Sequence, residues 1–215
     1  MQNLNKKQLA FTLAEILITL TIIGIIASLT IPNLIYEVQQ KQYTAAWKKN
    51  YSVISQAIKK AADDNGGTII PIGHEWATDV FNANFAQYLN AVRTCNAMAS
   101  AGICWHYNDP STWYTQHGER GGYAWRDNVP GMILADGTIL LTNIYADNTA
   151  GVHDSYILVD INGFKLPNTI GQDIFSINVH ENYVQPGGVG DLTSPSNCGQ
   201  LFWDGWGCSA KRLLE

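Results

Sequence analysis

Residues 16–35 form an apolar run that contains no charged side chain. The run is mostly Ile, Leu, Ala, Thr and Gly. As an α-helix, twenty such residues span about 30 Å, which is the thickness of the hydrocarbon core of a bilayer. Lys6 and Lys7 precede the run, and the positive-inside rule keeps them on the cytoplasmic side. The sequence therefore predicts a membrane-spanning helix near the N-terminus, with the rest of the chain outside the cytoplasm.

A carboxylate, Glu15, stands directly before this run. A cleaved signal peptide is one interpretation, but residues 26–33 at the end of the run offer no A-x-A cleavage site. An uncleaved membrane anchor is a second reading. It leaves Glu15 unexplained, because a carboxylate in lipid is costly and normally marks a partner. Any interpretation of this segment must therefore explain the position of Glu15.

The segment Ala10-Phe11-Thr12-Leu13-Ala14-Glu15, followed by the apolar run, resembles the N-terminal signal of type IV pilins and type II secretion pseudopilins. The resemblance covers residues 6–35. It implies that a prepilin peptidase cuts between Ala10 and Phe11 on the cytoplasmic side and then methylates the new N-terminus at Phe11. Ala10 replaces the glycine that the family usually has before the cut, and Ala14 replaces a larger aliphatic residue.

Glu15, Gly24 and Pro32 also fall on positions that the family usually fills with an acid, a glycine and a proline. The resemblance implies that in a filament Glu15 neutralises the charged amine of Phe11 on a neighbouring subunit, because an unpaired charge in a dry core is strongly disfavoured. A glutamate lying at the lipid interface is the alternative. Gly24 and Pro32 mark the expected bend, and Pro32 predicts a kink or local unwinding, since proline removes one backbone donor.

The helix is expected to continue to about Asp64. Apolar residues recur at steps of four, three and four and make one amphipathic face: Trp47, Tyr51, Ile54 and Ile58. Lys48, Lys49, Lys59 and Lys60 lie off this face. The glycines after Asp64 are typical of a helix end. We expect the Trp47 face to pack against the globular part of the same chain.

The remaining residues predict an α+β fold, in which the long N-terminal helix packs on a small antiparallel sheet. A second helix is expected over 75–92, and a hairpin joins 131–134 to 138–142 through a turn at 135–137. Further strands are expected over 155–160 and 173–179, and an irregular, disulfide-tied region over 183–215. We expect three parts: a cytoplasmic leader (1–10), a membrane and assembly helix (11–35), and a pilin-like globular domain (36–215) that includes the second half of the helix.

The four cysteines fall into two local pairs, Cys95 with Cys104 and Cys198 with Cys208. No C-x-x-C pattern occurs, so a zinc ribbon is not indicated. An even number of cysteines in an exported chain favours disulfides, and the local pairing closes two short loops. Four reduced thiols are the alternative.

Asp160, Asn162 and Asp173 are candidate calcium ligands, because alternate oxygen-bearing side chains before a glycine can wrap a hard cation. The spacing is not that of an EF-hand, since no glutamate stands at the twelfth position. Similar pseudopilins carry calcium near this edge of the sheet, so the resemblance implies the same ion here. The alternative is a set of Asx and glycine turns with no ion and no other cofactor.

The sequence does not favour an enzyme or a nucleic-acid-binding protein. It contains no H-E-x-x-H, G-x-S-x-G or Walker pattern, and a formal net charge of −5 does not favour binding to nucleic acid. A set of tryptophans suggests either a sugar-binding or subunit-contact surface, or ordinary packing. They are Trp105, Trp113, Trp125, Trp203 and Trp206.

The resemblance implies a structural subunit of a type IV pilus-like or type II secretion pseudopilus filament. Its expected partners are other pilin or pseudopilin subunits, the prepilin peptidase, the inner-membrane assembly platform and membrane lipid. The subunit is expected in the inner membrane before assembly and in a periplasmic or cell-surface filament afterwards. The alternative is a membrane-anchored extracytoplasmic binding module or enzyme that does not polymerise.

Processing gives the first testable prediction. Protein taken from its native cell should lack residues 1–10 and carry one added methyl group on Phe11, as measured by N-terminal mass spectrometry. An Ala10→Gly variant restores the usual residue before the cut and should be processed at least as completely. Assembled protein that keeps Met1 would contradict the prediction.

Overall fold

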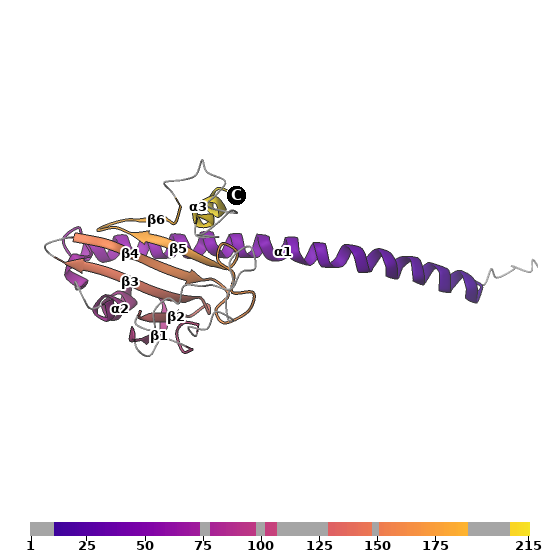
Figure 1. Ribbon diagram of the computed structural model, residues 1–215, viewed down its shortest axis with the longest axis horizontal. Coiled ribbons are helices and arrows are strands. Elements are labelled where there is room, and N and C mark those ends of the chain that lie inside the picture. Colours follow the sequence, from indigo (N-terminus) through magenta and orange to yellow (C-terminus); the bar gives the residue numbers. More distant parts are fainter. Residues whose placement is uncertain (1–10, 74–77, 98–101, 107–128, 148–150, 189–206) are drawn as a thin grey trace, which may run out of the picture. The chain divides into compact units, whose positions relative to one another are not determined.

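The computed structural model describes residues 11–73, 78–97, 102–106, 129–147, 151–188 and 207–215. The chain divides into two compact units, Met1–Lys41 and Gln42–Glu215. The helices are α1 (Leu13–Asp64), α2 (Thr78–Phe85) and α3 (Cys208–Leu214), with 3-10 turns η1 (Ile70–Ile72) and η2 (Ala86–Tyr88). The strands are β1 (Ala91–Cys95), β2 (Gly131–Leu134), β3 (Ile139–Asp147), β4 (Gly151–Asp160), β5 (Ile174–Val179) and β6 (Val184–Pro186), as labelled in Figure 1.

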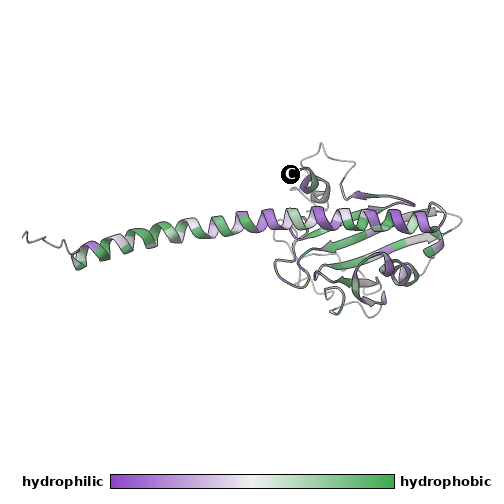
Figure 2. Cartoon of the chain, turned by 180° about the vertical axis from the view of Figure 1, so that it is seen from behind, coloured by the Kyte–Doolittle hydropathy of each residue, from purple (hydrophilic) through white to green (hydrophobic). Residues whose placement is uncertain are grey.

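The long helix predicted from the sequence is confirmed as α1, which changes from apolar to mixed polarity along its length (Figure 2). α1 runs through Gly24 and Pro32 without interruption, so the local unwinding that Pro32 predicted is wrong. Proline removes a single donor, which would have bonded the carbonyl of Ser28, and apolar helices tolerate one such loss. A kink at this position stays a prediction.

The six strands form one antiparallel sheet in the order β1-β2-β3-β4-β5-β6. Strands that follow one another along the chain therefore lie side by side in the sheet, as is common. The register places Leu140 opposite Val159 and Ile157 opposite Ile177. The predicted hairpin and the two further strands are confirmed, and β3 and β4 both extend beyond the predicted limits.

The predicted second helix over 75–92 is too long. Among the described residues of this range, only Thr78–Phe85 is α-helical, η2 follows, and Val92 belongs to strand β1 instead. Val92 is 65% exposed, so it does not contribute to a buried helix face. The β-branched Val92 and Thr94 favour the extended backbone, and pairing of β1 with β2 provides the hydrogen bonds.

The C-terminal region is more regular than predicted, because it contains β6 and α3. Ser209 at the start of α3 accepts a hydrogen bond from the backbone N–H of Ser176 in β5, at 2.9 Å through its Oγ atom. The backbone N–H of Ala210 donates to the carbonyl of Gly187 at 3.1 Å. These two bonds join α3 to β5 and to the end of β6.

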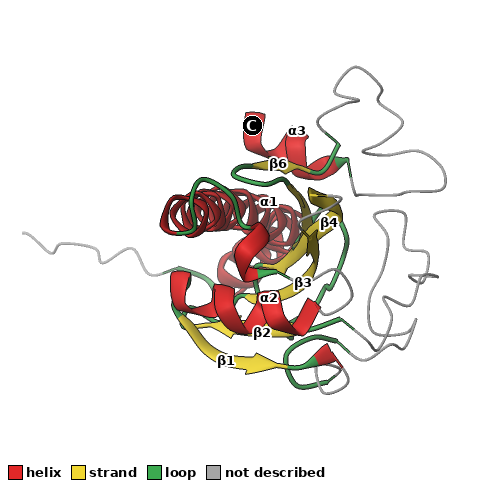
Figure 3. Ribbon diagram, turned by 90° about the vertical axis from the view of Figure 1, so that its left-hand side faces the viewer, coloured by secondary structure: helices red, strands yellow, loops and turns green. Residues whose placement is uncertain are grey.

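The predicted apolar face of α1 packs on the sheet of its own globular unit, as expected. Trp47, Ile54 and Ile58 are completely buried, and Tyr51 is partly buried beside them. The ring of Trp47 stacks on Phe175 of β5 at 4.5 Å between centroids, and its Nε1–H donates to the carbonyl of Ser209 at 2.9 Å. Helix α2 lies on the same face of the sheet as α1 (Figure 3) and adds Phe81 and Phe85 to this core.

A second, smaller core covers the opposite face of the sheet. Neighbouring residues of β2, β3, β4 and β5 alternate between the two cores, as the pleat of a strand requires. In β3, for example, Leu140 faces α1 while Ile139 and Leu141 belong to the second core. The loop residues Trp105 and Ile170 complete that second core. The sheet is therefore buried on both faces.

Polar contacts attach the β2–β3 turn to α1. The Nδ2 group of the buried Asn50 donates to Thr138 Oγ1 at 3.2 Å, and Lys49 Nζ lies 2.6 Å from Asp136 Oδ2. Asn50 is only 2% exposed, and sequence reasoning did not single it out, because a polar residue beside an apolar stripe is usually exposed.

Trp47 gives the second prediction. Trp47→Ala should lower the free energy of unfolding by about 3–5 kcal/mol, because it removes a buried ring and leaves a cavity. Trp47→Phe keeps a ring for stacking and loses only the hydrogen bond to Ser209, so its loss should be smaller, about 1–3 kcal/mol. Urea unfolding of the full-length chain in detergent, followed by circular dichroism, measures both values.

Lys48→Ala is the matched control, because Lys48 is the neighbouring residue on α1 and is exposed. Equal stability losses in Trp47→Ala and Lys48→Ala would show that the Trp47 contacts contribute nothing.

Candidate functional site

Helix α1 begins with a reciprocal hydrogen-bonded cap formed by Thr12 and Glu15. Oε2 of Glu15 accepts hydrogen bonds from the backbone N–H and the hydroxyl of Thr12, both at 2.8 Å. The backbone N–H of Glu15 donates to Thr12 Oγ1 at 3.2 Å. This is a capping box, in which the residue before the helix and the third helical residue each satisfy a free N–H of the other.

The capping box was missed by sequence reasoning, although the spacing T-x-x-E before an apolar run was a usable signal. It assigns Glu15 a role within its own chain. Among the described residues, its other carboxylate oxygen, Oε1, makes no hydrogen bond, so it is available to a partner. Phe11 is 81% exposed, whereas Ala10, the residue before the predicted cut, lies outside the described residues.

Among the described residues, none covers the apolar stretch of α1 after Glu15. Its large side chains are more than two-fifths exposed: Ile16, Leu17, Ile18, Leu20, Ile22, Ile23, Ile25, Ile26, Leu29, Ile31, Leu34 and Ile35. Among the described residues, α1 is the one helix long and apolar enough to cross a membrane, and its most apolar window is not buried. Such a surface is unstable in water, which indicates membrane insertion of the N-terminal helix.

The three candidate calcium ligands lie close together in the turn between β4 and β5. Asp160 ends β4, and its Oδ1 accepts from the backbone N–H of Asn162 at 3.1 Å, which is an Asx turn. Asn162 Nδ2 donates to Asp173 Oδ2 at 3.0 Å. Asp173 also accepts from the backbone N–H groups of Asn168 and Thr169, at 2.9 and 2.6 Å.

A buried histidine completes this cluster. His106 Nε2 lies 2.7 Å from Asp160 Oδ2, and both side chains are almost fully buried. Sequence reasoning did not connect His106 with Asp160, since the two residues are 54 positions apart. Burial raises the pKa of Asp160 to about 7; the hydrogen bond from His106 opposes this rise, while the charge of Asp173 adds to it. Burial also raises the pKa of Asp173.

The turn is held together by its own hydrogen bonds, as the Asx-turn alternative expects. Among the described residues, no group of three or more His, Cys, Asp and Glu side chains is placed to hold a metal ion. Asn162 supplies an amide oxygen, and its Oδ1 is buried with no hydrogen-bond partner among the described residues. Calcium binding by Asp160, Asn162 and Asp173 stays a prediction.

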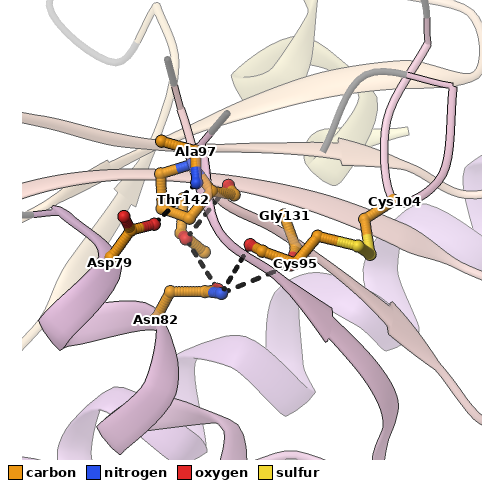
Figure 4. Close-up of a disulfide and its surroundings, with 8 residues drawn as sticks. Asp79, Asn82, Cys95, Ala97, Cys104, Gly131 and Thr142 are labelled. Atoms are coloured by element: carbon orange, nitrogen blue, oxygen red, sulfur yellow. Dashed lines mark hydrogen bonds between the residues drawn. A yellow bond between two sulfur atoms is a disulfide. The ribbon is translucent and has the colours of Figure 1, made fainter. Parts of the chain in front are cut away.

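The predicted Cys95–Cys104 disulfide is present. Beside it, the buried Asn82 of α2 donates to the carbonyls of Cys95 and Gly131, both at 3.3 Å, and accepts from Thr142 Oγ1 at 2.9 Å (Figure 4). Gly131 is required here, because an added Cβ would lie 3.0 Å from the Cβ of Cys104. The disulfide thus holds Trp105 and His106, which follow Cys104, against the sheet.

Only one cysteine of the second predicted disulfide lies among the described residues. Cys208 at the start of α3 is disulfide-bonded, while Cys198, its predicted partner, lies outside the described residues. Of the tryptophan set, Trp105 is 7% exposed and belongs to the second core, which agrees with packing. Trp113, Trp125, Trp203 and Trp206 lie outside the described residues.

The raised pKa of Asp160 gives the third prediction. Its folded value of about 7 lies above its ordinary value of 3.8, so the folded chain holds a proton that the unfolded chain has lost between these pH values. The free energy of unfolding should therefore fall as the pH rises from about 4 to about 7. In Asp160→Asn, which cannot ionise, this fall should be reduced. Urea unfolding at pH 4, 5.5 and 7 measures it, and equal slopes in the two proteins would contradict the assignment.

Comparison with known proteins identifies the N-terminal segment. Residues 5–31 match the family model described as the prokaryotic N-terminal methylation motif. No curated protein matches the chain, and no solved structure matches it. The match includes the predicted cleavage residues, the Thr12–Glu15 cap and most of the bare apolar stretch. The chain therefore carries the signal of pilin-like proteins that a prepilin peptidase processes, which supports its resemblance to the type IV pilins and type II secretion pseudopilins.

Proposed function

We propose that this protein is a structural subunit of a type IV pilus-like or type II secretion pseudopilus filament. One observation carries the proposal: the methylation motif leads directly into a capped helix whose apolar side chains are uncovered from Ile16 to Ile35. A membrane anchor would need the apolar helix alone. The motif, and the carboxylate oxygen of Glu15 that the cap does not use, are both explained if the processed terminus takes part in assembly.

The uncovered helix needs two successive environments in this proposal. Lipid covers it before assembly, and the helices of other subunits cover it in the filament. Helices leave lipid for each other through close packing, which small side chains permit. Gly24 exposes no side chain, and nothing lies within 4 Å of the position that a Cβ would take there. The apolar helix therefore offers neighbouring helices a place of close approach.

Glu15 has two tasks in the filament. Its Oε2 atom caps its own helix, and its Oε1 atom is available to the methylated amine of Phe11 on a neighbouring subunit. A pair of opposite charges in a dry core is strong only when both charges are present. This requirement selects the stacking register of the helices.

The buried pair of His106 and Asp160 favours the structural role over that of an extracytoplasmic enzyme. His106 and Asp160 would be the natural acid–base pair of the described residues, but His106 is 7% exposed and Asp160 is completely buried. A substrate could not reach either side chain without opening the core. We propose that the globular domain lies outside the cytoplasm, and that the prepilin peptidase, the inner-membrane assembly platform, membrane lipid and other subunits are its partners.

Glu15→Gln tests the proposal and is the fourth prediction. Glutamine keeps the size and the capping oxygen of glutamate, because either residue can complete a capping box, but it removes the charge. The variant should reach the membrane in at least wild-type amounts. Its share of the filament fraction should fall at least tenfold, because the neighbouring amine loses its charged partner. Immunoblots of membrane and sheared-filament fractions measure both.

Thr12→Ala is the matched variant, because it removes the capping hydroxyl and keeps the charge of Glu15. It should assemble better than Glu15→Gln. If Glu15→Gln assembles like the wild type while Thr12→Ala does not, capping alone explains Glu15. If wild-type protein never enters a filament fraction in its native cell, the filament proposal itself fails.

A further inference from the structure

Charge is distributed unequally over the second unit of the chain. Within α1, residues 42–60 contain Lys48, Lys49, Lys59 and Lys60 and no acidic residue. Residues 61–215 contain six Lys and Arg against sixteen Asp and Glu, which is a formal charge of −10. One helix segment is therefore basic in a unit that is otherwise strongly acidic.

The four lysines share the face of α1 that turns away from the sheet. Lys48 and Lys59 are eleven residues apart, as are Lys49 and Lys60, and eleven residues are close to three helical turns. The lysines thus form two short rows, with the exposed Ser52 and Gln56 between them. All four side chains are exposed, and the polar stretches of α1 are visible in Figure 2. We call this surface the lysine face.

Half of the lysine face is already paired within the chain. Lys49 pairs with Asp136 at 2.6 Å, and Lys59 pairs with Asp63 at 3.1 Å. Among the described residues, no carboxylate lies within 4 Å of Lys48 or Lys60. These two lysines stand at diagonal corners of the face and are the charges left for a partner.

Two exposed acidic residues lie at the C-terminal end of the same helix. Asp64 is the last residue of α1 and is exposed, and the last turn contains no basic residue. An acid at this end is unfavourable, because the helix dipole places negative charge there. Glu181 is exposed at the same end, where its carbonyl accepts from the N–H of Ile69 at 2.8 Å. We call Asp64 and Glu181 the acidic end.

We propose that the lysine face binds the acidic end of a second copy of this chain. This inference rests on the filament proposed above and assigns a contact between the globular units of neighbouring subunits. The lysine face lies along α1, and the acidic end lies at the C-terminal end of the same helix, so the contact is self-complementary only when two copies are displaced.

Membrane insertion makes this displacement necessary. Copies that enter one membrane by the same N-terminal helix point the same way, so an antiparallel pair cannot form. In parallel copies, Asp64 of one copy meets Lys60 or Lys48 of the next when the shift along the axis is about 6 or 24 Å, at 1.5 Å per residue. Each copy then uses its lysine face toward one neighbour and its acidic end toward the other. Such a heterologous contact builds an open fibre and not a closed dimer.

Zero-length cross-linking tests the contact in full-length protein from native filaments. A carbodiimide joins a lysine amine to a carboxylate only when the two are in contact. Filaments grown from mixed isotopically light and heavy chains should yield light–heavy peptides that join Lys48 or Lys60 to Asp64 or Glu181. Their absence, while other light–heavy cross-links form, would overturn the proposal.

Charge reversal provides the second test. Lys48→Glu with Lys60→Glu should lower the filament fraction about tenfold. The control is Lys165→Glu with Lys211→Glu, which changes the net charge equally at two exposed lysines elsewhere and should assemble like the wild type. Co-expression of the Lys48→Glu, Lys60→Glu chain with an Asp64→Lys, Glu181→Lys chain should restore mixed filaments.

The outcomes separate this inference from the filament proposal. If wild-type filaments form and the face variant assembles like the control variant, the lysine-face contact is wrong and the filament proposal stands. If the face variant fails and the complementary pair is not restored, the lysines act by another route and the contact is also wrong. Melting curves of each variant show whether the globular unit is folded.

Discussion

The two halves of helix α1 require different environments, and the rest of the structure follows from that constraint. The first half of α1 exposes its apolar side chains on every side, so it needs a non-aqueous environment that its own chain does not provide. The second half presents an apolar stripe on one side only, and the sheet covers that stripe. α1 is thus hydrophobic on all sides in its first half and on one side in its second half, so the two halves of the helix have different roles.

The sheet is organised around the buried stripe of α1. Trp47 joins three elements, since it belongs to α1, stacks on Phe175 of β5 and bonds the carbonyl of Ser209 in α3. On the other face, the Cys95–Cys104 disulfide holds Trp105 and His106 against the strands. Polar side chains connect these layers at few points, chiefly Asn50 and Asn82. Burial on both faces of the sheet stabilises it, and the buried amides determine which elements meet.

The parts of the fold that could be predicted were those with a local signal. The apolar stripe at Trp47 and the alternating strand at Phe175 repeat within a few residues, so periodicity was sufficient to predict them. The hairpin turn that contains Gly137 has an equally local signal. The first two residues of β1, Ala91 and Val92, were assigned to a helix. The pairing of β1 with β2 spans the 35 residues between Cys95 and Gly131, and no local pattern shows such a pairing. The His106–Asp160 contact was missed for the same reason. The cap at Thr12 was local, and its motif could have been read from the sequence.

The capping box has a consequence for the precision with which subunits meet. Removal of residues 1–10 would leave only Phe11 and Thr12 ahead of the first helical residue, Leu13. Two hydrogen bonds fix the direction in which this short end leaves the helix: the N–H of Thr12 donates to the side chain of Glu15, and the N–H of Glu15 donates to the side chain of Thr12. A terminal amine that is tethered so closely can visit few positions, so little conformational freedom is lost when a neighbouring carboxylate captures it. The new terminus would behave as a rigid extension of the helix and not as a loose tail.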